Sequence, residues 1–114
     1  MTIFALTTLL PNVIGTKNLL ELGVNHNVEN FLFFSSGEIY GNMKNKKILE
    51  SDVGKVDPLE LRSCYAESKR MGENMCVAWT KQFNVPAKIV RPFHTYGPGI
   101  SLDDGRVHAD FVKN

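Results

Sequence analysis

The stretch Phe31-Leu32-Phe33-Phe34-Ser35-Ser36-Gly37-Glu38 decides the fold of this chain. Its four consecutive apolar residues show no polar alternation, which predicts a strand buried on both faces, as in a parallel sheet covered by helices. Ser and Gly then end the strand. The segment Ala87-Lys88-Ile89-Val90 predicts a second strand, stopped by Pro92. Strands that alternate with helices are joined by right-handed crossovers, so we expect a parallel α/β sheet.

Helices are predicted before and between these strands. Pro11 suits the first turn of a helix, apolar residues recur over residues 12–22, and Gly23 follows them. Pro58 can open a second helix that runs to about Phe83. The apolar face of this second helix is expected to contain Met71, Met75, Ala78 and Trp79. Residues 41–57 are predicted to form a surface loop.

Composition narrows the classes of function. The chain has 114 residues, of which 43% are hydrophobic, enough for one small core. Its formal net charge of +1 gives no electrostatic footprint for a nucleic acid or an anionic membrane. No apolar stretch approaches the roughly 20 residues that span a bilayer. Composition therefore predicts a globular domain with neither nucleic acid nor membrane as partner.

Cysteine usage favours a reducing compartment, and the placing of cysteines and histidines predicts no metal site. Cys64 and Cys76 are the only cysteines, and no Cys-x-x-Cys occurs. This pattern makes neither a disulfide framework nor a zinc site, so a cytoplasmic location is expected. The three histidines are scattered without the spacing of metal ligands.

Tyr65 and Lys69 are the first candidate chemical pair. A spacing of four on a helix places the phenol and the ammonium on one face. A nearby cation favours the phenolate, and a tyrosine so placed can act as a base. The alternative is a half-buried tyrosine beside a solvated lysine.

Ser36 and Glu38 form the second candidate group. If the chain stays extended after the strand, side chains two apart point the same way. Gly37 between them allows a ligand or backbone to approach closely. The alternative is a plain turn, because Ser and Gly commonly end strands.

A third group follows the second strand in Arg91-Pro92-Phe93-His94-Thr95-Tyr96-Gly97-Pro98. Ligands of parallel sheets gather at the carboxyl ends of strands, where His94 and Thr95 could contact a phosphate or a sugar. Arg91 could instead pair with a carboxylate of the fold. Arg106, in Asp103-Asp104-Gly105-Arg106, is a further candidate for a ligand contact. The alternative is that it belongs to a solvated charge cluster.

Four stretches in order carry a resemblance to a known family. They are Asn12 to Glu21 (NVIGTKNLLE), Phe33 to Gly41 (FFSSGEIYG), Tyr65 to Arg70 (YAESKR) and Arg91 to Pro98 (RPFHTYGP). Together they resemble the extended short-chain dehydrogenase/reductase family of NAD-dependent nucleotide-sugar epimerases, dehydratases and decarboxylases, especially its UDP-glucuronate decarboxylase and dTDP-glucose 4,6-dehydratase branches. The resemblance implies a Rossmann-type doubly wound parallel sheet, NAD as cofactor, a nucleotide-sugar substrate and a homo-oligomer.

The resemblance also implies roles for individual residues. Tyr65 would take a proton from a sugar hydroxyl, Lys69 would hold the nicotinamide ribose, and Ser36 would hydrogen-bond the reacting oxygen. Glu38 would serve as acid or base in the second step. The implied cofactor contacts are Ser35, Tyr65, Lys69, Arg91 and Pro92. The implied substrate contacts are Gly37, His94, Thr95 and Arg106.

Three departures from the family pattern shape the expectations. The dehydratase pair Asp-Glu is Gly37-Glu38 here, which leaves decarboxylation or epimerisation open and weakens dehydration. His94 stands where the family usually has Asn. No Gly-x-x-Gly-x-x-Gly phosphate loop occurs among the 114 residues.

These departures set the expected domain organisation. Residues 1–11 are an atypical start, and residues 12–114 correspond to the middle of an NAD-binding domain that lacks its first strands. We therefore expect exposed sheet faces and edges and an oligomeric or aggregation-prone chain. The alternatives are a non-catalytic remnant of such an enzyme and a small α/β binding module of another kind, such as a flavodoxin-like one.

Overall fold

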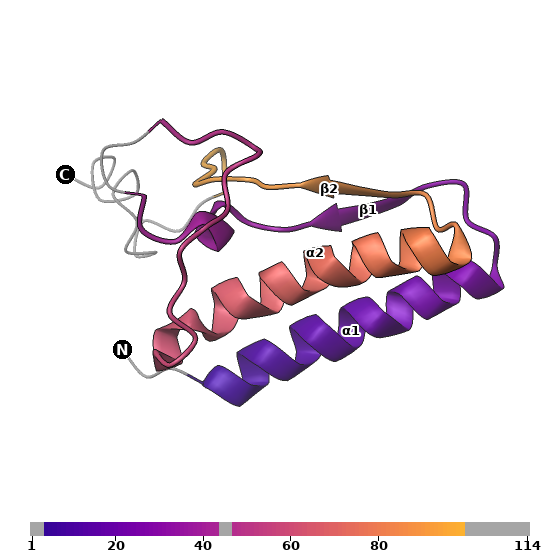
Figure 1. Ribbon diagram of the computed structural model, residues 1–114, viewed down its shortest axis with the longest axis horizontal. Helices are drawn as coiled ribbons and strands as arrows, with labels where there is room; N and C mark the ends of the chain where they lie inside the picture. Colours follow the sequence, from indigo (N-terminus) through magenta and orange to yellow (C-terminus); the bar gives the residue numbers. More distant parts are fainter. Residues whose placement is uncertain (1–3, 44–46, 100–114) are drawn as a thin grey trace.

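The computed structural model describes residues 4–43 and 47–99, which form two long helices and a small sheet (Figure 1). The elements, in chain order, are α1 (Ala5–Asn25), β1 (Phe31–Phe34), the 3₁₀ turn η1 (Gly37–Tyr40), the 3₁₀ turn η2 (Leu61–Ser63), α2 (Cys64–Phe83) and β2 (Ala87–Val90).

The two strands have the predicted bounds and the predicted parallel pairing. Phe31 lies opposite Ala87 and Phe34 lies opposite Val90, with α2 as the crossover between them. The predicted α/β fold with a parallel sheet is therefore confirmed, and the described residues contain a two-stranded part of such a sheet.

Burial of the sheet is one-sided among the described residues. Phe33 is buried at 8% exposure, whereas its neighbours Leu32 and Phe34 are 52% and 59% exposed. Figure 1 shows α2 beside the sheet and α1 beyond α2, so both helices lie on the Phe33 side. The prediction that both faces of β1 are buried is wrong for this part of the chain, because no described helix packs against the other face.

The core forms where both helices and β1 meet. Its centre consists of Leu20 from α1, Phe33 from β1, Cys76 from α2 and Val85 from the turn before β2. Because Leu20 and Cys76 are almost completely buried, the helices and the sheet share one core.

Small residues make the buried strip of α2. Ser68, Gly72 and Cys76, spaced four apart, are buried, whereas Met71 is 50% exposed. The predicted apolar face is therefore wrong at Met71, although Met75 and Trp79 pack against the core as expected. The strip is small because the Phe33 ring lies directly against Gly72.

Both helices begin at residues other than the predicted ones. Helix α1 begins at Ala5 and includes Pro11 in its interior, although a proline there removes one helical hydrogen bond and crowds the carbonyl four residues earlier. Helix α2 begins at Cys64 instead of Pro58, because the Asp57 carboxylate and carbonyl accept the N–H groups of Leu59 and Glu60 and close a turn there.

The end of α2 at Phe83 agrees with the prediction. Asn84 takes a left-handed conformation with φ 56°, and its N–H donates to the carbonyl of Thr80. Such a residue ends a helix while still satisfying one of its last carbonyls. The chain can then turn directly into β2.

The two cysteines are expected to differ in reactivity. Burial, with a smaller contribution from the charge of Glu73, raises the pKa of the Cys76 thiol to about 11, whereas Cys64 is half-buried. A thiol reagent at pH 8 should modify one thiol in the folded chain and two in urea, because the thiolate is the reactive form. Cys64→Ser should then show no fast reaction, and rapid modification of Cys76 in that variant would contradict the placement of this residue.

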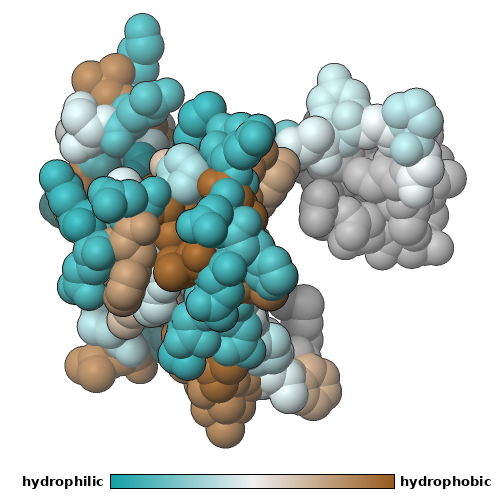
Figure 2. All heavy atoms as spheres, turned by 90° about the vertical axis from the view of Figure 1, so that its right-hand side faces the viewer, coloured by the Kyte–Doolittle hydropathy of each residue, from teal (hydrophilic) through white to brown (hydrophobic). Residues whose placement is uncertain are grey.

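Exposed apolar residues predict self-association. Figure 2 shows apolar residues on the surface between polar ones, and Leu32 and Phe34 on the open sheet face belong to the exposed set. Sedimentation velocity of the chain should show species larger than a monomer that grow with concentration. Leu32→Lys should reduce this association more than Leu59→Lys, since Leu59 lies in a turn away from the sheet. A stable, cooperatively unfolding monomer would contradict the prediction.

Neither helix in the described part of the chain has an 18-residue stretch apolar enough to cross a membrane.

Candidate functional site

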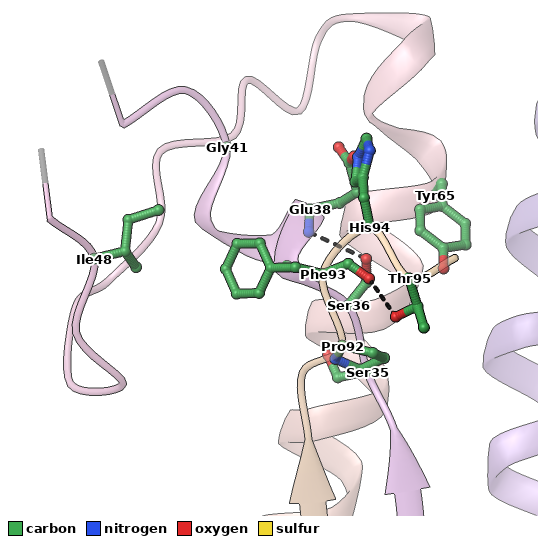
Figure 3. Close-up of a pocket in the computed structure, with 11 residues that line it drawn as sticks. Ser35, Ser36, Glu38, Gly41, Ile48, Tyr65, Pro92, Phe93, His94 and Thr95 are labelled. Carbon is green, nitrogen blue, oxygen red and sulfur yellow. Dashed lines mark hydrogen bonds and ion pairs between the residues drawn. The ribbon is translucent and has the colours of Figure 1, made fainter. Parts of the chain in front are cut away.

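A pocket of about 660 Å³ opens at the carboxyl ends of β1 and β2 (Figure 3). Its volume lies within the usual range for small-molecule sites. Four parts of the chain contribute to it: the segment after β1, the long loop, the start of α2 and the segment after β2. Its lining consists of Ser35, Ser36, Gly37, Glu38, Gly41, Ile48, Tyr65, Pro92, Phe93, His94 and Thr95.

Backbone hydrogen bonds extend the parallel ladder into the pocket. The N–H of Ser35 donates to the carbonyl of Val90 at 2.8 Å, and the N–H of Gly37 donates to the carbonyl of Pro92 at 3.0 Å. The polar segments after the two strands are therefore held side by side, as expected for the carboxyl ends of neighbouring strands.

Ser36 and Glu38 both line the pocket, although the chain between them is not extended. Ser36 is extended, its Oγ accepts the N–H of Glu38 at 3.1 Å, and the chain then turns into η1. The alternative of a turn is the one that the structure shows, because the serine hydroxyl caps the 3₁₀ turn. The turn nevertheless leaves both side chains at the pocket.

Gly37 is closely covered by a side chain of the fold. A Cβ at this position would lie 2.7 to 2.9 Å from three atoms of the Phe93 ring. The close approach that the glycine permits is therefore made by Phe93 rather than by a ligand. The Phe93 ring occupies the space that a side chain at position 37 would need.

Tyr65 and Lys69 lie on one face of α2, directed toward the end of β1. The Tyr65 side chain is 40% exposed and lines the pocket together with Ser36. The Lys69 ammonium donates to the carbonyl of Phe34 at 2.8 Å and lies 5.8 Å from the centre of the Tyr65 ring. The predicted helical pair is thus placed beside the polar end of the predicted strand.

His94 and Thr95 lie on the segment after β2. The Nε2 atom of His94 is 3.9 Å from Oε1 of Glu38, and both side chains are mostly exposed at the pocket (Figure 3). The Thr95 hydroxyl donates to the carbonyl of Phe93 at 3.0 Å. A ligand in the pocket would meet an imidazole, a carboxylate and a hydroxyl on this side.

Arg91 does not line this pocket. Its guanidinium donates to both carboxylate oxygens of Glu73, to the Tyr40 hydroxyl and to the carbonyl of Glu50. This is the alternative in which Arg91 pairs with a carboxylate of the fold. Ser35 is buried, and its hydroxyl lies beside the Glu73 carboxylate, whose pKa it helps to lower. Arg106 lies outside the described residues.

Sequence reasoning did not assign Gly41, Ile48 or Phe93 to the site. Phe93 lies in the motif Arg91 to Pro98, but an apolar side chain gives no sequence signal for a ligand contact. Ile48 reaches the pocket from the long loop, and a loop residue distant in sequence carries no periodic signal.

Across residues 4–43 and 47–99, no three His, Cys, Asp or Glu side chains are placed to hold a metal ion.

A family model matches residues 4–114, and its description is the NAD dependent epimerase/dehydratase family. The chain belongs to the NAD dependent epimerase/dehydratase family. This assignment agrees with the resemblance of the four sequence motifs, and the match begins at residue 4, just before α1.

Relatives within the epimerase/dehydratase family include UDP-glucuronic acid decarboxylases. UDP-glucuronic acid decarboxylase 4 of Arabidopsis thaliana is 40% identical over 105 residues, which are 92% of this chain and 24% of that protein. UDP-glucuronic acid decarboxylase 1 of Xenopus tropicalis is 39% identical over 92% of this chain and 25% of that protein. The chain spans about a quarter of the length of these relatives.

Solved structures of epimerases share the fold. UDP-glucuronic acid 4-epimerase from Bacillus cereus, solved with NAD, is 30% identical with a TM-score of 0.67 over 81% of this chain and 28% of that chain. A putative epimerase from Burkholderia cenocepacia is 28% identical with a TM-score of 0.76 over 95% of this chain and 33% of that chain. The described helices and strands therefore share part of the Rossmann-type fold of these epimerases.

Proposed function

We propose that this chain carries the catalytic side chains of an NAD-dependent nucleotide-sugar decarboxylase or epimerase. The observation that carries the proposal is the pocket that Tyr65 and Ser36 line together, with Lys69 held at the end of β1. Relatives that act on UDP-glucuronic acid support a uronic acid sugar nucleotide as substrate. Decarboxylation and epimerisation both fit, because Gly37 supplies no acid and Phe93 fills its space.

The residues at the carboxyl ends of the strands fit NAD. The Lys69 ammonium has three donors, and one of them goes to the carbonyl of Phe34. We propose that Ser35, Tyr65, Lys69 and Pro92 hold the cofactor. NAD⁺, when bound, supplies a hydride acceptor. Four donors of Arg91 are occupied within the fold, so we assign this residue no cofactor contact.

The protein's own side chains would transfer the proton. Tyr65 removes it from a sugar hydroxyl, with the Lys69 ammonium 5.8 Å from the centre of its ring. Ser36 donates a hydrogen bond to the same sugar oxygen from the opposite segment. Glu38, beside His94, serves the second step as acid or base. His94 and Thr95 contact the sugar or its phosphates, whereas Gly37 is covered by the Phe93 ring and is assigned no contact.

The 114 residues contain no Gly-x-x-Gly-x-x-Gly loop, which binds the cofactor pyrophosphate in such domains, so we assign no pyrophosphate contact within them. For a catalytic chain we expect a homo-oligomer in a reducing cytoplasm.

Two measurements test the proposal. Calorimetry of the purified chain should show saturable binding of NAD⁺ if the proposed contacts suffice to hold the cofactor. In a chimera, the 105 matched residues of this chain replace the corresponding segment of UDP-glucuronic acid decarboxylase 4 of Arabidopsis thaliana. This chimera should convert UDP-glucuronic acid. A folded but inactive chimera would contradict the catalytic assignment.

A further inference from the structure

Arg91 is the centre of a half-buried network that links four parts of the chain. Its Nε and Nη2 atoms donate to the two carboxylate oxygens of Glu73 on α2, both at 2.8 Å. Its Nη1 atom donates to the Tyr40 hydroxyl at 2.7 Å and to the carbonyl of Glu50 at 2.9 Å. Four of the five N–H donors of the guanidinium are therefore used.

The Arg91–Glu73 pair is held in its charged form. Burial by itself raises the pKa of Glu73, but the hydrogen bonds and charge of Arg91, with the neighbouring Ser35 hydroxyl, hold that pKa below its usual value. The hydrogen bond to Glu73 raises the pKa of Arg91. The side chains are only 13% and 25% exposed, so the two-pronged geometry is enclosed by protein.

The network continues to the pocket through aromatic rings. The Arg91 guanidinium lies 5.1 Å from the centre of the Tyr40 ring. That ring stacks on Phe93 at 5.9 Å with an interplanar angle of 12°, and Phe93 covers Gly37. Gly37 begins η1 and Tyr40 ends it, so side chains of the segment after β2 contact both ends of this turn. Glu38 lies between these two contacts.

We infer that Arg91 is a positioning residue: held by Glu73 on α2, it fixes Tyr40 and thereby places η1 against the helix that carries the base. Arg91, Glu73 and Tyr40 are absent from the pocket lining, so they act only through the residues that they hold. The catalytic role of this positioning rests on the proposed function. The contacts themselves require neither cofactor nor turnover, so they can be tested separately.

Hydrogen–deuterium exchange of the 114-residue chain, read by mass spectrometry of peptides, tests this inference. Arg91→Lys keeps the charge but loses the planar guanidinium whose donors bind Glu73 and Tyr40 at the same time. Peptides covering residues 36–43 should exchange about tenfold faster, because the turn opens locally, while peptides from residues 13–25, which lie outside the network, keep their rates. Arg62→Lys is the matched control, since Arg62 is exposed on η2, and it should change neither region.

Tyr40→Phe provides a second and milder variant. It retains the ring stack on Phe93 and removes only the hydroxyl that accepts from Arg91. Acceleration confined to residues 36–43 supports the inference even if Arg91→Lys does not fold. Equal acceleration of all peptides, or no change in residues 36–43, would overturn it. Since the assay contains no NAD⁺, failure of NAD⁺ binding leaves this result intact and counts only against the proposed function.

Discussion

Tyr65→Phe in the decarboxylase chimera is expected to lower kcat for UDP-glucuronic acid by about 10²–10⁴-fold, the usual contribution of a general base. The substitution removes only the phenolic oxygen, so the ring keeps its position beside Lys69. KM should change little, because the proton transfer stabilises the transition state more than the bound substrate. Steady-state kinetics measure both constants.

Tyr96→Phe provides the matched control for this loss. Tyr96 is 74% exposed and does not line the pocket, so the same chemical change there should retain most of the activity. NAD⁺ affinity of both variants should be compared, because the proposed role of Tyr65 includes a cofactor contact. Unchanged turnover in Tyr65→Phe would remove this tyrosine from the mechanism and leave the pocket without a base from α2.

Gly72→Ala is expected to destabilise the chain by about 2 kcal/mol, within the range for overpacked cores. A Cβ at this position would lie 2.9 and 3.0 Å from two atoms of the buried Phe33 ring and closer still to a third. Alanine normally stabilises a helix interior by about 1 kcal/mol relative to glycine. The clash decides the sign, because both β1 and α2 are held in the core and neither can retreat without losing contacts with Leu20 and Cys76.

Gly15→Ala is the control with the opposite sign. Gly15 also lies inside a helix, but nothing lies within 4 Å of the position that its Cβ would take. This variant should gain up to about 1 kcal/mol. Urea unfolding followed by circular dichroism, at one fixed protein concentration, measures both variants. A stabilised Gly72→Ala would show that α2 and β1 are not in close contact.

The close contact at Gly72 also matters for the site. Gly72 lies less than one helical turn beyond Lys69, whose ammonium reaches the carbonyl at the end of β1. If alanine pushes α2 away from β1, Lys69 and Tyr65 move away from Ser36. The same substitution in the chimera should therefore lower activity as well as stability.

Local patterns predicted the elements that position the site. An unbroken apolar run and an apolar segment stopped by proline were enough for β1 and β2, because such strands are specified by their own residues and by the turns that end them. The spacing of Tyr65 and Lys69 placed both on one helical face, since helical geometry fixes that relation without tertiary contacts. The four ordered motifs then led to the family that the family model also indicates.

Features that depend on competing partners were not predictable. Helix α2 begins at Cys64 because the Asp57 carboxylate accepts a backbone N–H that a helix starting at Pro58 would use differently. Met71 is exposed because the strip that faces Phe33 must be made of small residues. In each case, two local choices have similar free energies and a neighbouring segment decides between them.

The sequence by itself determined the order of the elements, the parallel pairing and the set of polar residues at the strand ends, because these follow from periodicity and from parallel topology. Tertiary structure decided which partner each polar side chain takes. Arg91 binds Glu73, 18 residues away, and Tyr40, 51 residues away, instead of a ligand. A guanidinium forms its strongest bonds with whichever acceptors the fold brings within reach, and that distance is set only when α2 packs on the sheet.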